Sequence, residues 1–334
     1  MRNYFYAALF CCFSLAPTQA DIHVANQMRF EVLKTGFQVN AGSEAYFDLT
    51  AANIGDRFEV SVQSTNGLFP DISAYVCLKG GTNQNCLGYT KTKAPYRFSI
   101  DVKKPGNYIL KFDNTYSAFT NKKGSVSVNA TLQIDQNTRA NFEQMFRGME
   151  QEIFSTFNVP KFNMRLQPCR SENAFSLNDG GHITICSELF MKLIREQKPG
   201  ALMGIIFHEL GHSLLNLWGQ PNWNNEETVD EFAITMMYWD GIQEKAFDWV
   251  SYFEAKNSVQ EANHILQKGD THPLSIQRAR NARNILNNPA QVISRWNKFL
   301  YPYLTTSKLR ALIDNPGKHG DRALANRVLQ SRSH

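Results

Sequence analysis

Long hydrophobic runs and blocks of like charge are both lacking in this 334-residue chain. Lys and Arg together number 35 and Asp and Glu 30, so the net charge is +5, and no five or six like charges follow one another. This balance gives no support to nucleic acid or a membrane surface as a partner. Beyond the N-terminal segment, no apolar stretch reaches about 18 residues, so we expect no stable membrane insertion of the mature chain.

The first twenty residues have the pattern of a secretory signal peptide. Arg2 supplies a positive charge, residues 4–15 form an apolar run, and Ala20 ends the segment with a small residue suited to cleavage. The run is short for a bilayer span, and an uncleaved anchor is the alternative. Cys11 and Cys12 lack a small-residue motif before them, which disfavours a lipoprotein. We expect export, and the sequence does not distinguish the periplasm from full secretion.

The chain contains six cysteines but no C-x-x-C pair. Removal of the signal peptide leaves four of them, Cys77, Cys86, Cys169 and Cys186. Four thiols in an oxidising compartment allow three pairings, of which the local one is the most economical. We therefore expect the disulfides Cys77–Cys86 and Cys169–Cys186. A zinc site built from these cysteines is disfavoured because C-x-x-C spacing is absent.

Residues 21–135 have the pattern of an all-β accessory domain. Apolar and polar residues alternate in three short runs, which are separated by Gly, Pro and Asn turn signals (58–62, 98–102 and 126–130). Short strands at this spacing are typical of a β-sandwich. Residues 105–114 and 125–128 resemble the last strands of GOLD-like or pre-peptidase sandwiches, and this resemblance implies an accessory or binding module.

The pattern changes near Asp135. Apolar residues then recur at helical spacing over residues 142–157, which indicates a core-facing helix. Two strand-like segments follow, at 162–166 and 182–186, and the chain from residue 226 onward is mainly helical. The sequence thus predicts a multidomain protein, an all-β sandwich followed by an α+β, mainly helical domain over residues 136–334.

The central motif is His208-Glu209-Leu210-Gly211-His212, on a predicted helix over residues 201–218. Residues four apart share one face of a helix, so both imidazoles can bind one Zn²⁺ while Glu209 reaches a metal-bound water. Gly204 and Gly211 would let neighbouring backbone approach closely. The alternative is two surface histidines on an ordinary helix.

A catalytic zinc usually has a third protein ligand. Glu226 and Asp230 are four residues apart on a predicted helix, so Glu226 can bind the zinc while Asp230 hydrogen-bonds the far nitrogen of a ligating histidine. Glu227 is the competing ligand. An acidic, solvated helix start is the alternative to any metal role.

His272 precedes Pro273 in a loop before a predicted helix. Such a histidine could donate a hydrogen bond to the oxyanion of a tetrahedral intermediate. A histidine before proline is also a common turn residue, and this alternative stays open.

These motifs occur in the order found in gluzincin metallopeptidases of the HtpX and prenyl-protein-peptidase type, with Arg278 following His272. The chain also resembles a group of uncharacterised secreted bacterial proteins described as metallopeptidases. The resemblance covers about residues 137–290 and implies a zincin-like domain with one Zn²⁺ per chain. By that resemblance His208, His212 and Glu226 are the zinc ligands.

The same resemblance implies roles for the other residues of these motifs. Glu209 would be the general base, Asp230 the partner of a ligating histidine, and His272 a stabiliser of the transition state.

The segment from Asn173 to Ile183 resembles one that these enzymes carry before the zinc helix. Its Asn-Ala-Phe and Gly-Gly-His-Ile parts match, and two cysteines flank it as in the secreted group. The resemblance implies a hairpin and edge strand along which a peptide substrate lies, a mode of binding that is physically reasonable. The residues carried over are Asn173, Ala174, Phe175, His182 and Ile183.

The sequence therefore predicts an exported zinc-dependent endopeptidase acting on a peptide or protein. Two alternatives remain. One is a zinc hydrolase of a non-peptide amide, such as a cell-wall bond, because the metal residues serve either substrate. The other is a non-catalytic binding protein with a vestigial zinc site, against which the intact motif argues.

Overall fold

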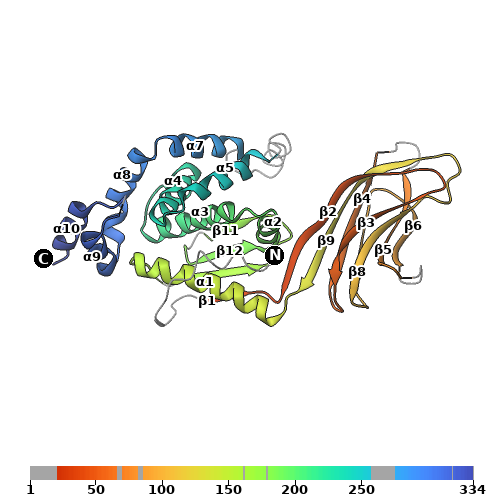
Figure 1. The fold of residues 1–334 in the computed structure, drawn as a ribbon, viewed down its shortest axis with the longest axis horizontal. Coiled ribbons are helices and arrows are strands. Elements are labelled where there is room, and N and C mark those ends of the chain that lie inside the picture. The colour runs from red at the N-terminus through yellow and green to blue at the C-terminus, as the bar shows by residue number, and fades with distance from the viewer. Residues whose placement is uncertain are drawn as a thin grey trace.

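The computed structural model describes residues 21–65, 70–81, 86–160, 162–177, 180–256, 275–317 and 319–333. It consists of two parts placed end to end, an all-β part and a part with both helices and a sheet (Figure 1). The predicted fold class, an all-β sandwich followed by an α+β region, is confirmed.

Two antiparallel sheets form the sandwich within the described part of the chain. One has the order β2-β9-β4-β7 and the other β3-β8-β5-β6. The two sheets share an apolar core, into which alternate residues of β4 point, namely Phe58, Val60 and Val62. The disulfide Cys77–Cys86 joins directly opposite residues of β5 and β6. The strands are β2 Gln27–Val39, β3 Glu44–Ala52, β4 Arg57–Ser64, β5 Asp71–Leu78, β6 Cys86–Lys93, β7 Tyr96–Asp101, β8 Gly106–Asp113 and β9 Lys122–Gln133.

The second sheet has the order β1-β10-β12-β11. Strand β1 (Asp21–Val24) pairs in parallel with β10 (Asn163–Gln167), and β10 pairs in parallel with β12 (His182–Cys186). Strand β11 (Ala174–Ser176) is antiparallel to β12 and lies at the edge. A second disulfide, Cys169–Cys186, closes the loop that contains β11.

Strand β1 changes the expected division of the chain. The predicted sandwich domain begins at residue 21, yet residues 21–24 pair with β10. Ile22 and Val24 are buried in the core of the α+β part. The sandwich is therefore inserted between β1 and α1 of the second part, and the chain crosses between the two parts twice.

Helices cover both faces of this sheet. In Figure 1, α1 runs below the sheet and α3 above it, while α4, α5 and α7 lie over α3. Side chains of Asp135 and Asn225 accept N–H groups at the starts of α1 and α4, and prolines begin α3 and α8. The helices are α1 Gln136–Thr156, α2 Ser187–Arg195, α3 Pro199–Leu217, α4 Glu226–Trp239, α5 Ala246–Glu254, α7 Ser275–Asn287, α8 Pro289–Leu300, α9 Thr306–Asp314 and α10 Arg322–Ser331.

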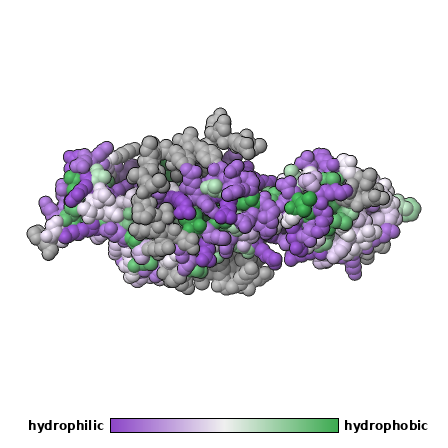
Figure 2. All heavy atoms as spheres, turned by 90° about the horizontal axis from the view of Figure 1, so that it is seen from below, coloured by the Kyte–Doolittle hydropathy of each residue, from purple (hydrophilic) through white to green (hydrophobic). Residues whose placement is uncertain are grey.

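Among the described residues, no helix combines the length and the apolar composition that a membrane crossing needs. On the face shown in Figure 2, hydrophobic residues lie in small groups among hydrophilic ones.

Glycines let α3 pack closely against its neighbours. A Cβ built on Gly204 would lie 2.8 Å from two ring carbons of Trp249 on α5, and one on Gly211 would lie 2.9 Å from the ring of Phe232 on α4. Close approach at these glycines was predicted, but the groups that approach are aromatic side chains rather than backbone.

We expect Gly204→Ala to lower the free energy of unfolding by about 1–3 kcal/mol, because the fully buried Trp249 ring must shift. Denaturant unfolding followed by circular dichroism measures this change. Gly148→Ala in α1 is the matched control, since nothing lies within 4 Å of its added Cβ. For this control we expect the free energy of unfolding to rise by about 0.5–1 kcal/mol, because alanine lowers the backbone entropy of the unfolded chain. Equal effects of both substitutions would contradict the packing argument.

Candidate metal centre

Helix α3 places the two histidines of the motif side by side in the interior. His208 is 4% exposed and the His212 side chain 11%. Their Nε2 atoms are 3.1 Å apart, and the rings stand nearly perpendicular to each other. Residues four apart on a helix face the same way, and here that face is turned toward α4.

The first turn of α4 brings a carboxylate to the same point. Glu226 Oε2 is 3.2 Å from His208 Nε2, and Glu226 Oε1 is 3.5 Å from His212 Nε2. One ligand atom from each of these three residues lies within 4.8 Å of the others. Glu227 instead is exposed and accepts a hydrogen bond from Asn281 on α7. The structure therefore brings Glu226, not Glu227, to the histidines.

Each imidazole is oriented through its other nitrogen. Nδ1 of His208 lies 2.8 Å from Asp230 Oδ1, and Nδ1 of His212 lies 2.7 Å from the backbone carbonyl of Trp223. Both partners accept hydrogen bonds, so they favour the tautomers with the proton on Nδ1. Both Nε2 lone pairs are then directed toward Glu226, as a metal requires.

Arg278 on α7 completes the group. Its Nη2 and Nε lie 2.6 Å and 3.0 Å from the two oxygens of Asp230, and Nη1 is 3.5 Å from Glu226 Oε2. The guanidinium carbon stands 4.5 Å from the centre of the Phe253 ring. Although Arg278 belongs to the ordered motifs of the sequence, only the structure shows that it clamps Asp230.

The charges of the site favour a divalent cation. Glu209, Glu226 and Asp230 are 7%, 8% and 2% exposed, and Arg278 is the positive side chain among them. With both histidines neutral, this group carries two net negative charges in a poorly solvated region. Buried charge is costly unless it is compensated, and one divalent cation bound by two imidazoles and a carboxylate supplies that compensation.

Without a metal, a proton on His208 compensates part of the negative charge of the carboxylates. Burial and Arg278 oppose protonation of His208, but hydrogen bonds to Asp230 and Glu226 outweigh them and raise its pKa to about 9. Burial would raise the pKa of Asp230, yet Arg278 and His208 hold it below its ordinary value. The site is thus arranged to hold positive charge between its carboxylates.

Of the two residues predicted for catalysis, Glu209 lies in the described part of the chain. Glu209 is buried beside His208 on α3, and its charge is among those that raise the pKa of Arg278. His272 lies outside the described residues, together with the Pro273 that follows it.

The residues predicted for the substrate strand lie on a β11–β12 hairpin. Ala174 and Phe175 are on the edge strand β11, and the carbonyl of Asn173 just before it accepts a hydrogen bond from Cys186 N. His182 and Ile183 are on β12, which pairs with a neighbour on both sides. These two residues therefore support the edge strand but cannot offer their backbone to a ligand.

Strand β11 is tied directly to the metal-site helix. The hydroxyl oxygens of Ser176 and Ser213 are 2.7 Å apart, and Ser213 follows His212 on α3. The sequence did not predict a role for either serine, because their contact depends on how β11 packs against α3.

Residues 129–286 match the family model DUF4344, whose description reads "Putative metallopeptidase". The match spans fewer than half of the residues but includes β11, both histidines, Glu226 and Arg278. No curated protein matches the chain. The finer similarity to HtpX-type gluzincins stays a prediction.

Several solved structures match part of the chain. PliG of Aeromonas hydrophila, a periplasmic inhibitor of g-type lysozyme, is 14% identical over 33% of this chain and 98% of its own, with a TM-score of 0.22. FlhE is 9% identical over 33% and 100%, with a TM-score of 0.25. CBM86, a low-affinity xylan binding module from Roseburia intestinalis, is 11% identical over 32% and 96%, with a TM-score of 0.23. Similarities of this size assign neither a fold nor a role to the chain.

We expect Arg278→Met to lower the free energy of unfolding by about 3–5 kcal/mol, because it leaves the buried Asp230 carboxylate without its cation. Arg283→Met on the same helix is the control. Arg283 pairs with Glu254 at the surface, where a salt bridge contributes about 0–1 kcal/mol. Denaturant unfolding of both variants measures the difference, and similar losses would contradict the importance assigned to the Asp230 contact.

We also expect the metal-free protein to lose stability as the pH rises. The pKa of His208 is about 9 in the folded state, above its ordinary value of 6.5. A raised pKa stabilises the fold fully below pH 6.5, and this stabilisation is lost as the pH rises through 9. Unfolding of chelator-treated protein across this range measures the loss, with His208→Gln as a control that should lose less. A free energy of unfolding that does not fall between these pH values would contradict the assignment.

Proposed function

We propose that this chain is an exported zinc-dependent endopeptidase. The observation that carries the proposal is the convergence of two imidazole nitrogens and the Glu226 carboxylate, with both imidazoles held by acceptors on their far nitrogens. The match of residues 129–286 to a metallopeptidase family supports it.

The donor set fits zinc. Two histidines and one glutamate are a ligand set of catalytic zinc sites, in which a fourth position stays open for water or substrate. His208, His212 and Glu226 would hold one Zn²⁺ per chain, which would polarise the scissile carbonyl and lower the pKa of a bound water to about 7.

Glu209 is the proposed general base. It lies on α3 next to His208, buried at the same site as the ligands. A carboxylate there can take the proton of the attacking water and deliver it to the leaving amine. His272 is kept as the candidate donor to the oxyanion, on the sequence motif alone.

The exposed side of β11 is the proposed binding edge for the substrate. Leu177 N donates to His182 O, and Cys186 N donates to Asn173 O, so residues 173 and 177 bond toward β12. In an antiparallel ladder this direction alternates, so the backbone N–H and C=O groups of Ala174 and Ser176 face away from β12. An extended peptide can pair there as an added strand. This edge favours a peptide over other amides as the substrate.

Export rests on the pattern of the first twenty residues, and the two disulfides fit an oxidising compartment. The peptide or protein substrate is then one met outside the cytoplasm.

We expect Glu209→Gln to keep one zinc per chain and to lower kcat by at least about 10²-fold, because the base is lost while the ligands remain. Inductively coupled plasma mass spectrometry gives the zinc content, and digestion of a peptide library gives the activity. Undiminished cleavage by this variant would exclude Glu209 as the base. Zinc at full occupancy with no cleavage by the wild-type chain would favour a non-catalytic binding protein.

The third ligand is tested by a pair of neighbouring substitutions. We expect Glu226→Ala to weaken zinc binding at least about tenfold in chelator competition, because the carboxylate at the two imidazoles is removed. Glu227→Ala should bind zinc as the wild type does, since its side chain faces Asn281. The opposite result would assign the third ligand to Glu227.

A further inference from the structure

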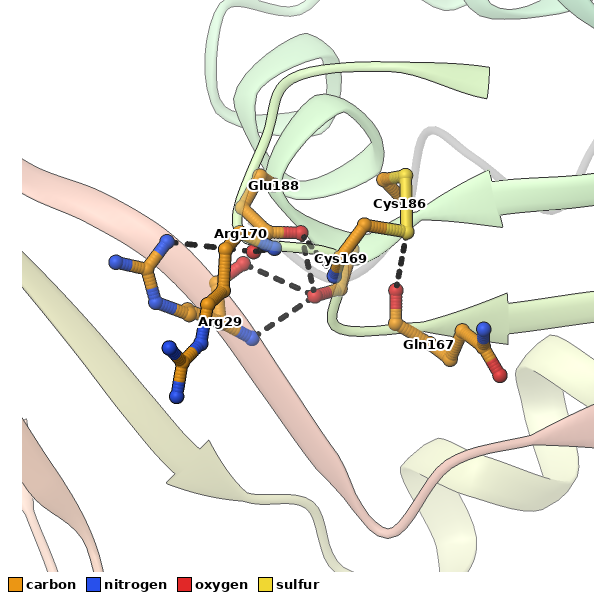
Figure 3. Close-up of a disulfide and its surroundings, with 7 residues drawn as sticks. Arg29, Gln167, Cys169, Arg170, Cys186 and Glu188 are labelled. Carbon is orange, nitrogen blue, oxygen red and sulfur yellow. Dashed lines mark hydrogen bonds and ion pairs between the residues drawn. A yellow bond between two sulfur atoms is a disulfide. The ribbon is translucent and has the colours of Figure 1, made fainter. Parts of the chain in front are cut away.

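Glu188 joins the start of α2 to the segment that leads into β11. Its carboxylate is buried and accepts two backbone N–H groups, from Cys169 at 3.1 Å and from Arg170 at 2.6 Å (Figure 3). A carboxylate in the first turn of a helix is favourable by itself. Here, however, its oxygens are used by a different segment, the turn just before the edge strand.

The same carboxylate meets a residue of the sandwich. Arg29 Nη1 from β2 lies 3.3 Å from Glu188 Oε1, while Nη2 lies 2.7 Å from Glu59 on β4. The Arg29 side chain is 13% exposed, so this contact is largely shielded from solvent. One guanidinium therefore bridges a sandwich carboxylate and the carboxylate that holds residues 169 and 170. Figure 3 shows the Arg29–Glu188 side of this bridge.

Backbone contacts at the same place fix the geometry further. Ser187 Oγ accepts the Arg29 N–H at 2.9 Å and donates to the Arg29 carbonyl at 3.0 Å. The disulfide Cys169–Cys186 ties the turn to the end of β12, and Cys186 N bonds to the carbonyl of Asn173. The path from the sandwich to the first residue before β11 is thus a continuous series of short polar and covalent contacts.

We propose that Arg29 and Glu188 are positioning residues through which the sandwich holds β11 in place for an extended peptide. The proposal rests on the proposed function only in taking β11 as the substrate strand. Strand β11 has three residues and, within the described part of the sheet, pairs only with β12, while Ser176 contacts Ser213 at its far end. So short a ladder leaves its outer N–H and C=O groups dependent on how the preceding turn is held. The Arg29–Glu188 contact supplies that alignment from outside the sheet.

Through Arg29 and Glu188 the sandwich would then contribute to substrate affinity. Loss of the contact should allow residues 169–177 to open locally, which weakens pairing with a substrate peptide. It should leave the His208–His212–Glu226 group intact, because those residues lie on α3 and α4. The expected signature is a higher KM at nearly unchanged kcat.

Hydrogen exchange measured by mass spectrometry on the full chain tests the coupling without reference to activity. For Arg29→Met we expect amide exchange in residues 169–177 to rise about tenfold, while exchange in residues 205–214 of α3 stays as in the wild type. Glu188→Gln, which keeps one oxygen acceptor but places an NH2 donor against the other backbone N–H, should show a rise of at least similar size in the same segment. The control is Arg57→Met, which removes a half-exposed ion pair with Asp101 within the sandwich and should change neither segment.

Kinetics on peptides long enough to span β11 complete the test. We expect KM to rise at least about threefold for Arg29→Met with kcat within about twofold, and Arg29→Lys to restore part of the affinity. Unchanged exchange in residues 169–177, or a rise that is equal across α3, would overturn the proposal, as would faster exchange with an unchanged KM. If the wild-type chain cleaves no peptide, the proposed function fails, and the exchange data alone decide whether the sandwich holds β11.

Discussion

The carboxylate of Asp230 makes the contact on which the rest of the site depends. It lies 2.8 Å from Nδ1 of His208 and accepts hydrogen bonds from Nε and Nη2 of Arg278, so one buried group links α3, α4 and α7. Because it holds Nδ1 of His208, it orients the ring so that Nε2 faces Glu226. Its own charge is tolerable only because Arg278 compensates it. The geometry of the candidate metal site, the packing of the three helices and the local charge balance therefore all depend on this carboxylate.

The residues that meet at the centre could be predicted because their relation is local. His208 and His212, and likewise Glu226 and Asp230, are four apart on helices, and helical geometry alone places each pair on one face. Contacts without a local pattern could not be predicted. The carbonyl of Trp223 is a backbone group that any residue provides, and Arg278 reaches Asp230 from 48 positions along the chain.

Packing decides which of Glu226 and Glu227 faces the two histidines. The rotation of α4 about its axis is fixed by Val229, which is fully buried and lies beside Gly211. This rotation turns Glu226 inward and Glu227 outward.

In the fold, the alternation of apolar and polar residues in β4 was enough to predict the sandwich. The parallel pairing of residues 21–24 with β10 could not be predicted, because the sequence of a four-residue strand does not specify a partner so distant along the chain. The sandwich is consequently an insertion rather than a separate first domain.

In the proposed site, two imidazoles and one carboxylate hold a single zinc ion. X-ray absorption spectroscopy at the zinc edge of the zinc-loaded chain tests it most directly. We expect two imidazole nitrogens at about 2.0–2.1 Å and oxygen ligands at about 2.0–2.2 Å, with no sulfur. A sulfur shell at about 2.3 Å, or a first shell without two imidazoles, would contradict it.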